Sequence, residues 1–438
     1  MPINRKEMQA IARKYHEPIA LVTGSDSGVE AAKALKHYGL RTIIYVSKKK
    51  APDYIKKLNC NRKQDKDLRP NNHLVVADDL AEIKKKDSWE TAVFRLNAYP
   101  EITKHVDELL ALECIQIPSK AFSILIGGDE KCNIIENQFA IPIMGSRKLF
   151  KIANIGATEK DCRWFAQKVG IPCVEFYEFK LSENGIRFTQ PVNEPLVLLA
   201  GYAVASEKKT IIGENSGDLE ERVSKEVLAG NIDKTILERA WAQQFLLGAD
   251  VNLNFFFSPI DAKKEWGTAD DMFASLYNTS LEDARVCLAN ELVSIEERKA
   301  DILERIKDLP IQFQTQVKGF VKTFRLPKIT LNFSEDFLFE DLLKHDDQLL
   351  LLLREEEPPG IIGSWSLQAT MLQKGVSSYE LKLTGMNLGL YDRLDAETIC
   401  PLIDLAKRKR QTEMTLGERT ALELYRSKKQ DALSEIVT

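Results

Sequence analysis

The chain has 438 residues, of which 44% are hydrophobic, and this is enough for two or three packed subdomains. A formal net charge of -4 excludes a global electrostatic footprint for nucleic acid. The seven cysteines form no CxxC pair, which predicts reduced thiols and a cytoplasmic setting. No histidine lies between His105 and His345, so a zinc site or a Ser-His-Asp hydrolase in the central region is disfavoured. No signal peptide is predicted, and the longest apolar run, Leu349–Leu353, is too short to cross a bilayer.

A β-loop-α-β unit is predicted near the amino terminus. Its parts are an apolar run, a loop of small residues, a helical pattern and a second apolar run: Ile19–Thr23, Gly24–Gly28, Val29–Tyr38 and Arg41–Val46. A loop of this kind can bind phosphate through backbone N–H groups and the helix dipole. The alternative is a tight strand-to-helix turn capped by Ser25 or Ser27.

Further elements follow in order. Lys48–Asn72 is rich in Lys and Arg, which predicts a solvated insertion or loop, with binding to an acidic partner as the alternative. Short strands are predicted at Leu74–Ala77 and Cys114–Ile117, with helical structure at Ile102–Leu112 between them. Asp161–Gly170 is predicted to be a helix that leads into a strand.

Two segments in the second half have clear periodicity. Asn252–Pro259 carries several aromatic residues in a strand-like pattern. Glu282–Leu309 repeats apolar residues at spacings of four and three, which predicts a helix with a heptad seam. We interpret this helix as part of an insertion near 281–325 that packs on its own domain or across a subunit contact, which leaves a homo-oligomer open.

The stretch Pro358–Leu390 predicts a β-hairpin. It opens with a Pro-Pro-Gly turn and contains two apolar segments, Ser364–Met371 and Tyr379–Leu383. Each segment carries one oxygen donor, Gln368 or Glu380, and such a pair on adjacent strands suits Mg²⁺. The alternative is a strand amide and an edge charge without a metal.

This stretch also carries a family resemblance. PPGIIGSWSLQ followed by YELKL resembles the signature of the archaeal formate-dependent AICAR ligases of purine synthesis, which reads PPG-x-IGPF-x-LQ and then FEMSAR. Residues 137–147 and 241–248 resemble that family's EN-x-F-x-VP-x-FGNR and EEYVVG segments. The resemblance runs from Ala20 to about Tyr425 and implies an α/β and α+β protein. A Rossmann-like domain (1–150) would precede an ATP-grasp fold with a small lobe (151–247) and a large lobe (248–438).

The resemblance implies candidate site residues. The family's Mg²⁺-binding Gln and Glu fall on Gln368 and Glu380. ATP-binding positions fall on Gln243, Gln244 and Leu246 at the hinge and on Lys208 and Lys209 in the flap. Substrate-binding positions fall on Ser25, Asp26, Ser27, Ser119, Arg147 and Asn278. For Arg147 a structural role at the entry to the next subdomain is the alternative, and no catalytic residue is assigned.

The sequence also departs from the family. Asp26 and Ser119 stand where the family has histidines, Ala121 replaces a serine, and Leu199 replaces a lysine that faces the ATP phosphates. The first hypothesis is therefore an ATP-dependent carbon–nitrogen ligase of the carboxylate–amine type with an altered substrate pocket. The alternative is a catalytically degenerate relative that acts as a binding or assembly subunit. ATP, Mg²⁺ and small-molecule substrates, among them a ribotide, are the expected ligands; no nucleic acid or membrane partner is expected.

Overall fold

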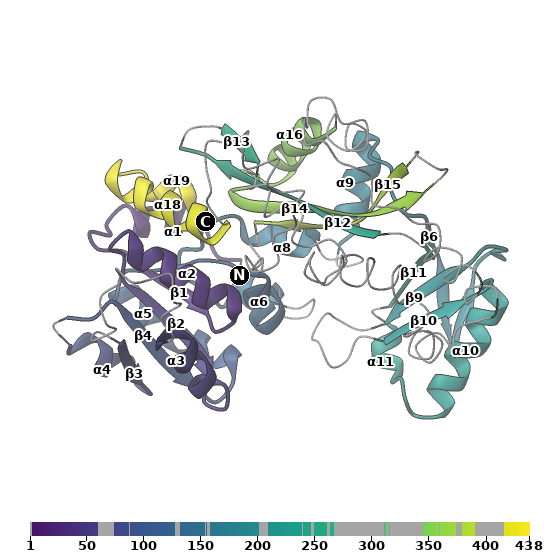
Figure 1. Cartoon of the computed structure of the whole chain (residues 1–438), viewed down its shortest axis with the longest axis horizontal. Coiled ribbons are helices and arrows are strands. Elements are labelled where there is room, and N and C mark those ends of the chain that lie inside the picture. The colour runs from purple at the N-terminus through teal and green to yellow at the C-terminus, as the bar shows by residue number, and fades with distance from the viewer. Residues whose placement is uncertain are drawn as a thin grey trace, which may run out of the picture.

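The computed structural model describes residues 2–59, 74–86, 88–127, 132–153, 155, 158–200, 209–238, 240–246, 249–260, 263–266, 311, 315, 345–358, 360–373, 379–389 and 416–438. Three main sheets organise these residues (Figure 1). The amino-terminal sheet lies on one side of the molecule, the second sheet on the opposite side, and the third between and above them. No helix among the described residues is long and apolar enough to cross a membrane.

The first sheet is parallel and has the order β3-β4-β2-β1-β5. Its strands are β1 (Ile19–Thr23), β2 (Thr42–Ser47), β3 (Leu74–Ala77), β4 (Thr91–Leu96) and β5 (Cys114–Gln116). Every residue of β1 is buried, as expected for a strand covered on both faces. Because the chain moves from β1 to β2 on one side and returns to β5 on the other, the topological switch point lies between β1 and β5.

Helices surround this sheet. They are α1 (Arg5–Ala12), α2 (Asp26–His37), α3 (Ala51–Asn59), α4 (Leu80–Lys84), η1 (Tyr99–His105), α5 (Val106–Ala111), α6 (Lys120–Phe122), the π-helical turn η2 (Ser123–Gly127) and α7 (Cys132–Asn137). The next helix, α8 (Arg147–Ala153), packs on α7 and on the third sheet. The carboxy-terminal helices α18 (Leu416–Lys429) and α19 (Leu433–Ile436) join the same core, where Leu424 and Ile436 are fully buried. The Ile143 N–H donates to the Thr438 carbonyl at 3.1 Å, so the end of the chain is bound to the first unit.

The turn after β1 is packed too tightly for larger side chains. A Cβ on Gly28 would lie 2.1 Å from the Thr23 carbonyl oxygen, and one on Gly24 would lie 2.7 Å from Val46. Ser25 is the N-cap of α2, and its hydroxyl accepts the Gly28 N–H at 3.0 Å. The predicted capped turn is therefore present, with Ser25 as the cap.

Arg147 lies in the interior of the first unit. Its guanidinium donates hydrogen bonds to the carbonyls of Ile135 (3.0 Å), Phe139 (2.8 Å) and Ile141, and the residue is only 6% exposed. Burial lowers the pKa of Arg147 to about 9. Because its donors bind the protein's own backbone, the structure favours the structural alternative for Arg147 over a substrate-binding role.

The second sheet is antiparallel and backed by one helix. Its order is β10 (Lys209–Gly213), β9 (Leu196–Ala200), β11 (Trp241–Gln244) and β6 (Phe176–Tyr177), with a separate hairpin of β7 (Phe179–Ser182) and β8 (Gly185–Phe188) and the short helix α11 (Lys234–Leu237) nearby. Leu196 and Leu198 pack with Leu219 and Val223 of α10 (Ser216–Leu228) in one apolar cluster. Alternate residues of β9 therefore face α10, and Leu199 faces away from it.

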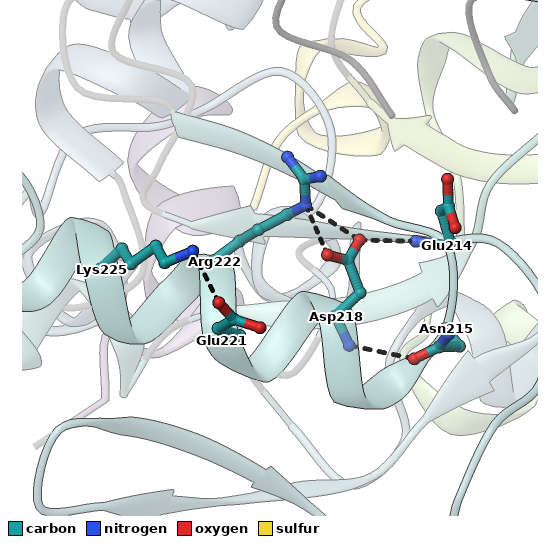
Figure 2. A network of polar contacts seen from close by, with 6 residues as sticks. All are labelled: Glu214, Asn215, Asp218, Glu221, Arg222 and Lys225. Carbon is teal, nitrogen blue, oxygen red and sulfur yellow. Dashed lines mark hydrogen bonds and ion pairs between the residues drawn. The ribbon is translucent and has the colours of Figure 1, made fainter. Parts of the chain in front are cut away.

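Polar contacts fix the first turn of α10 (Figure 2). Asn215 is the N-cap and accepts the Asp218 N–H at 3.0 Å, while the Asp218 carboxylate accepts the Glu214 N–H at 3.0 Å. Arg222 Nε donates to the same carboxylate at 2.9 Å. This reciprocal arrangement satisfies N–H groups that the helix cannot pair internally.

The third sheet has the order β13-β12-β14-β15 and is antiparallel throughout. Its strands are β13 (Lys263–Trp266), β12 (Ala249–Ser258), β14 (Gly363–Gln373) and β15 (Tyr379–Leu388), and the helices α9 (Cys162–Val169) and α16 (Asp346–Glu356) accompany it. Trp365 and Phe255 stack with their ring centroids 4.3 Å apart in the core of this sheet. The turn before β14 uses Gly360, whose φ is +83°.

A buried carboxylate joins the third sheet to the carboxy-terminal helix. Glu423 of α18 accepts the hydroxyl of Ser258 at 2.7 Å and an N–H of Arg419 at 2.9 Å, and its side chain has no solvent exposure. The Arg419 guanidinium also lies 4.3 Å from the centroid of the Phe256 ring. Since α18 packs on the first unit, these contacts connect the first and third sheets.

Most predicted strands are present, with two corrections. The strand β4 was missed, although it lies in the middle of the first sheet. Within the predicted insertion Lys48–Asn72, residues 51–59 form the regular helix α3, and 60–72 lie outside the described residues. The heptad segment Glu282–Leu309 also lies outside the described residues and stays a prediction.

Asn215→Ala should weaken α10 locally, because an N-cap contributes about 1 kcal/mol. We expect amide hydrogen exchange in peptides covering Ser216–Leu228 to speed up about fivefold. Glu221→Ala is the matched control on the same helix, because its ion pair with Lys225 is exposed and should change exchange much less. Equal exchange in both variants would contradict the capping account.

Arg147→Met should destabilise the first unit by about 3 kcal/mol or more, because three buried carbonyls lose their donor. Thermal unfolding followed by circular dichroism measures this effect. Lys148→Met is the control, since Lys148 is exposed and pairs only with Glu357 at the surface. An unchanged melting temperature for Arg147→Met would show that the guanidinium does not hold the core together.

Candidate functional site

The predicted substrate residues of the first unit gather at one edge of the parallel sheet. Ser25 and Ser27 follow β1, and Ser119 follows β5, which pairs directly with β1. This edge is the topological switch point, where open α/β sheets bind ligands. Ser27 and Ser119 are buried, and the Ser119 hydroxyl accepts the Phe122 N–H at 3.3 Å. Ser25 and Ser119 therefore organise backbone turns beside the expected pocket.

A polar chain lies where the second sheet meets the third. Gln244, at the end of β11, donates an N–H to Glu194 at 2.9 Å and accepts an N–H of Lys382 on β15 at 3.1 Å. The Tyr177 hydroxyl donates to the other carboxylate oxygen of Glu194. Burial and this carboxylate raise the pKa of Tyr177, so the phenol stays protonated. The contacts fix the orientation of the Gln244 amide at the hinge.

Three of these residues were not predicted from the sequence. Tyr177 and Glu194 lie outside the segments that resemble family motifs, and Lys382 lies within YELKL without being singled out. A usable signal was present for Lys382, because alternation along β15 places it on the same face as Glu380. Gln243, by contrast, is buried and accepts the indole N–H of Trp241 at 3.2 Å.

Leu199 lies in the strand β9, as the sequence pattern predicted. It pairs with Trp241 of β11 and Thr210 of β10 in the middle of the second sheet. Its side chain is half-buried and lies on the face opposite the α10 cluster. A lysine at this position would point to the same side, which is the side that the resemblance assigns to ATP.

The predicted hairpin exists, but its register separates the two proposed metal ligands. Gln368 lies opposite Gly385, whereas Glu380 lies opposite Leu372, four residues farther along β14. The separation along the strand is roughly 13 Å at 3.3 Å per residue. Side chains in a sheet stand nearly perpendicular to it, so Gln368 and Glu380 do not converge on one ion with Mg–O distances near 2.1 Å. They share a face of the hairpin but not a site.

The residue opposite Gln368 has no side chain. A Cβ built on Gly385 would lie 2.9 Å from Gln368 Oε1, so the amide of Gln368 covers the position. Two hydrogen bonds between neutral groups lie beside it: Ser366 accepts an N–H of Asn387 at 3.1 Å, and Thr384 donates to the Gln368 carbonyl at 3.2 Å. Within the described part of the chain, no group of three or more His, Cys, Asp or Glu residues could hold a metal ion. Gln368 and Glu380 therefore do not form one Mg²⁺ site together.

Several predicted residues cannot be placed. Lys208 and Asn278 lie outside the described residues, as does the flap 201–208. The backbones of Asp26 and Lys209 are described in α2 and β10, but their side chains are not. Leu246 follows β11 and is half-buried.

A cavity of about 310 Å³ lies away from all of these residues. It opens at the amino ends of β1, β2 and β4, the edge opposite the switch point. Arg41 and Trp89 contribute to its wall, with the guanidinium 5.3 Å from the ring centroid. Arg41 is also paired with Glu17 at 3.1 Å.

Comparisons with known proteins agree with this architecture. The family described as "Domain of unknown function (DUF1297)" matches residues 218–438, which is half of the chain. A curated protein of Methanopyrus kandleri, named 5-formaminoimidazole-4-carboxamide-1-(beta)-D-ribofuranosyl 5'-monophosphate synthetase, is 19% identical over 448 aligned residues that cover both chains fully. A protein of the same name from Korarchaeum cryptofilum is 24% identical over 269 residues, 60% of each chain.

A solved structure shows the fold. The crystal structure of an IMP biosynthesis protein PurP from Thermococcus kodakaraensis superposes with a TM-score of 0.51 at 16% identity and covers 96% of this chain and 100% of that one. This likeness supports a Rossmann-like domain followed by an ATP-grasp fold. The chain belongs to the family described as "Domain of unknown function (DUF1297)" and is a divergent relative of the archaeal formate-dependent AICAR ligases.

Proposed function

We propose that the protein binds ATP between its second and third sheets, as ATP-grasp ligases do. The observation that carries this proposal is the hinge, where Gln244 of β11 contacts Lys382 of β15 across the junction of the two sheets. The chain passes directly from β11 to β12 here, so a ligand at the hinge contacts both sheets at once. Gln243, Gln244 and Leu246 are the residues proposed to contact the adenosine, with Lys208 and Lys209 toward the phosphates.

The proposed reaction class is carbon–nitrogen ligation. In such a reaction ATP phosphorylates a carboxylate to give an acyl phosphate and ADP, and an amine then displaces phosphate to form an amide. The acceptor site is proposed at the switch point between β1 and β5, with Ser25, Asp26, Ser27 and Ser119. Because Asp26 and Ser119 replace histidines of the resembling family and an acidic residue repels phosphate, we propose a substrate other than AICAR.

A second candidate is a degenerate relative that binds nucleotide without turning it over. Two observations favour it. Leu199 gives the central strand of the second sheet an apolar side chain where the resembling family has a lysine, and the position opposite Gln368 is a glycine. Loss of one preorganised cation typically removes several kcal/mol of transition-state stabilisation, or two to three decades in rate.

The organisation of the whole protein is also proposed. The first unit corresponds to 1–150, the small lobe to 151–247 and the large lobe to 248–438, with the carboxy-terminal helices α18 and α19 packed back on the first unit. We propose a cytoplasmic protein with small-molecule substrates, and the insertion near 281–325 is the proposed site of any self-association.

Leu199→Lys should tighten ATP binding by about tenfold, because a cation at this position would face the phosphates. Isothermal titration calorimetry with ATP measures the affinity. Leu228→Lys, at an exposed position of α10, is the control for added positive charge. If neither affinity nor stability changes in Leu199→Lys, the residue does not face the cleft.

Turnover with the substrates of the resembling family tests both candidates. With formate, AICAR and ATP, we expect weak or absent ligase activity in the natural protein. Product formation at a rate typical of enzymes, of order 1–10³ s⁻¹, would contradict the degenerate candidate and the altered pocket together.

A further inference from the structure

Among the described residues of the β14–β15 hairpin, Lys382 is the positively charged side chain on the polar face. Alternation along both strands places Gln368, Thr370, Leu372, Glu380 and Lys382 on one face, since residues 370 and 382 pair directly. The opposite face holds the buried residues Leu367, Ala369, Leu381 and Leu383.

The register also changes which residue corresponds to the glutamate of the family motif FEMSAR. If the family's glutamate lies opposite its glutamine, the matching residue here is Gly385, and Met386 then follows it as Met follows Glu in the motif. The motif's arginine falls on Gly389. On that alignment, two charged positions of the motif are glycines in this chain, whereas Glu380 lies nearer the hairpin's tip.

The backbone conformation at residue 385 does not require a glycine. It is not among the residues with positive φ, so a side chain at this position causes no backbone strain. The only close neighbour of an added Cβ is Gln368 Oε1, the end of a flexible side chain. A carboxylate side chain therefore fits at residue 385. Because the residue is glycine, no charged side chain lies opposite the neutral amide of Gln368.

Lys382, unlike Gly385, places a charged side chain at the hinge. Its ammonium donates to the neutral amide oxygen of Gln244, so that bond does not cancel its charge, and two further N–H donors remain available to a ligand. It lies half-buried at the junction of the two sheets, where the charge is screened less than at the surface. A phosphate bound beside the hinge would find this cation without any metal.

We propose that the hinge binds an anionic nucleotide without a divalent cation, an inference that rests on the nucleotide binding proposed above. Lys382 of β15 supplies the neutralising charge, and Gly385 marks the position of the lost metal ligand.

The first experiment measures ADP binding by isothermal titration calorimetry in excess EDTA and in excess Mg²⁺. The two dissociation constants should agree within twofold for the natural protein, and Lys382→Met should weaken binding at least tenfold in both buffers. Lys180→Met, at an exposed position of β7, is the matched control and should leave the affinity unchanged. Binding that requires Mg²⁺, or that is unaffected in Lys382→Met, would overturn the proposal.

The second experiment needs no nucleotide. Free Mn²⁺ is followed by electron paramagnetic resonance as protein is added. The natural protein and Glu380→Gln should leave the Mn²⁺ signal unchanged, whereas Gly385→Glu combined with Gln368→Glu should reduce it by forming a carboxylate pair. Mn²⁺ binding by the natural protein that is lost in Glu380→Gln would overturn the proposal, as would a folded double variant that binds no Mn²⁺.

The two experiments test nucleotide binding and metal binding separately. If ADP binds in neither buffer, the proposed nucleotide function is wrong, and the Mn²⁺ titration still decides whether the hairpin lacks a metal site. Circular dichroism melting of each variant confirms that the comparison is made between folded proteins.

Discussion

The pairing of β14 with β15 decides which side chains share each face of this hairpin. The ladder places Gln368 opposite Gly385 and shifts by one residue immediately afterwards. Because a strand alternates its side chains, this register directs Lys382 and Glu380 to the polar face and Leu381 and Leu383 to the core. The contact of Lys382 with Gln244 of the second sheet follows from that alignment.

The same strand links the parts of the molecule. Leu383 exchanges backbone hydrogen bonds with Pro172 and Val174, which lead into the second sheet, and Lys382 reaches Gln244 at the hinge. On the far side of the third sheet, Ser258 and Arg419 share the buried carboxylate of Glu423, which ties the sheet to α18 and the first unit. A buried carboxylate with two donors is costly to disrupt, so this contact also restricts how the sheets move.

Much of the fold could be predicted from local sequence. The alternating and apolar runs identified β1, β2, β12 and the hairpin. A turn capped by Ser25 or Ser27 was the alternative to a phosphate loop, and the structure shows Ser25 as the cap. The strand β4 was missed, although its pairing partners on both sides are strands that were predicted. The docking of α18 and α19 on the first unit joins segments far apart in the chain, which local patterns do not encode.

The site was less predictable, for two physical reasons. Residue spacing within a hairpin does not give its register, so YELKL suggested Glu380 as the partner of Gln368 although Gly385 faces it. The type of a side chain also does not show which groups it will bind. Arg147 resembles a ligand-binding arginine in sequence, yet its donors are used by three backbone carbonyls. Lys382 and Glu194 both contact Gln244, but they lie 138 and 50 positions from it in the chain, so local sequence patterns do not bring them together.

A crystal structure with ADP and Mn²⁺, recorded at the manganese absorption edge, tests this account most directly. The account predicts ADP at the hinge beside Gln243 and Gln244, its phosphates within reach of Lys382, and no anomalous peak next to Gln368. An anomalous peak coordinated by Gln368 together with Glu380 would contradict the register argument, and ADP bound away from the hinge would contradict the proposed cleft.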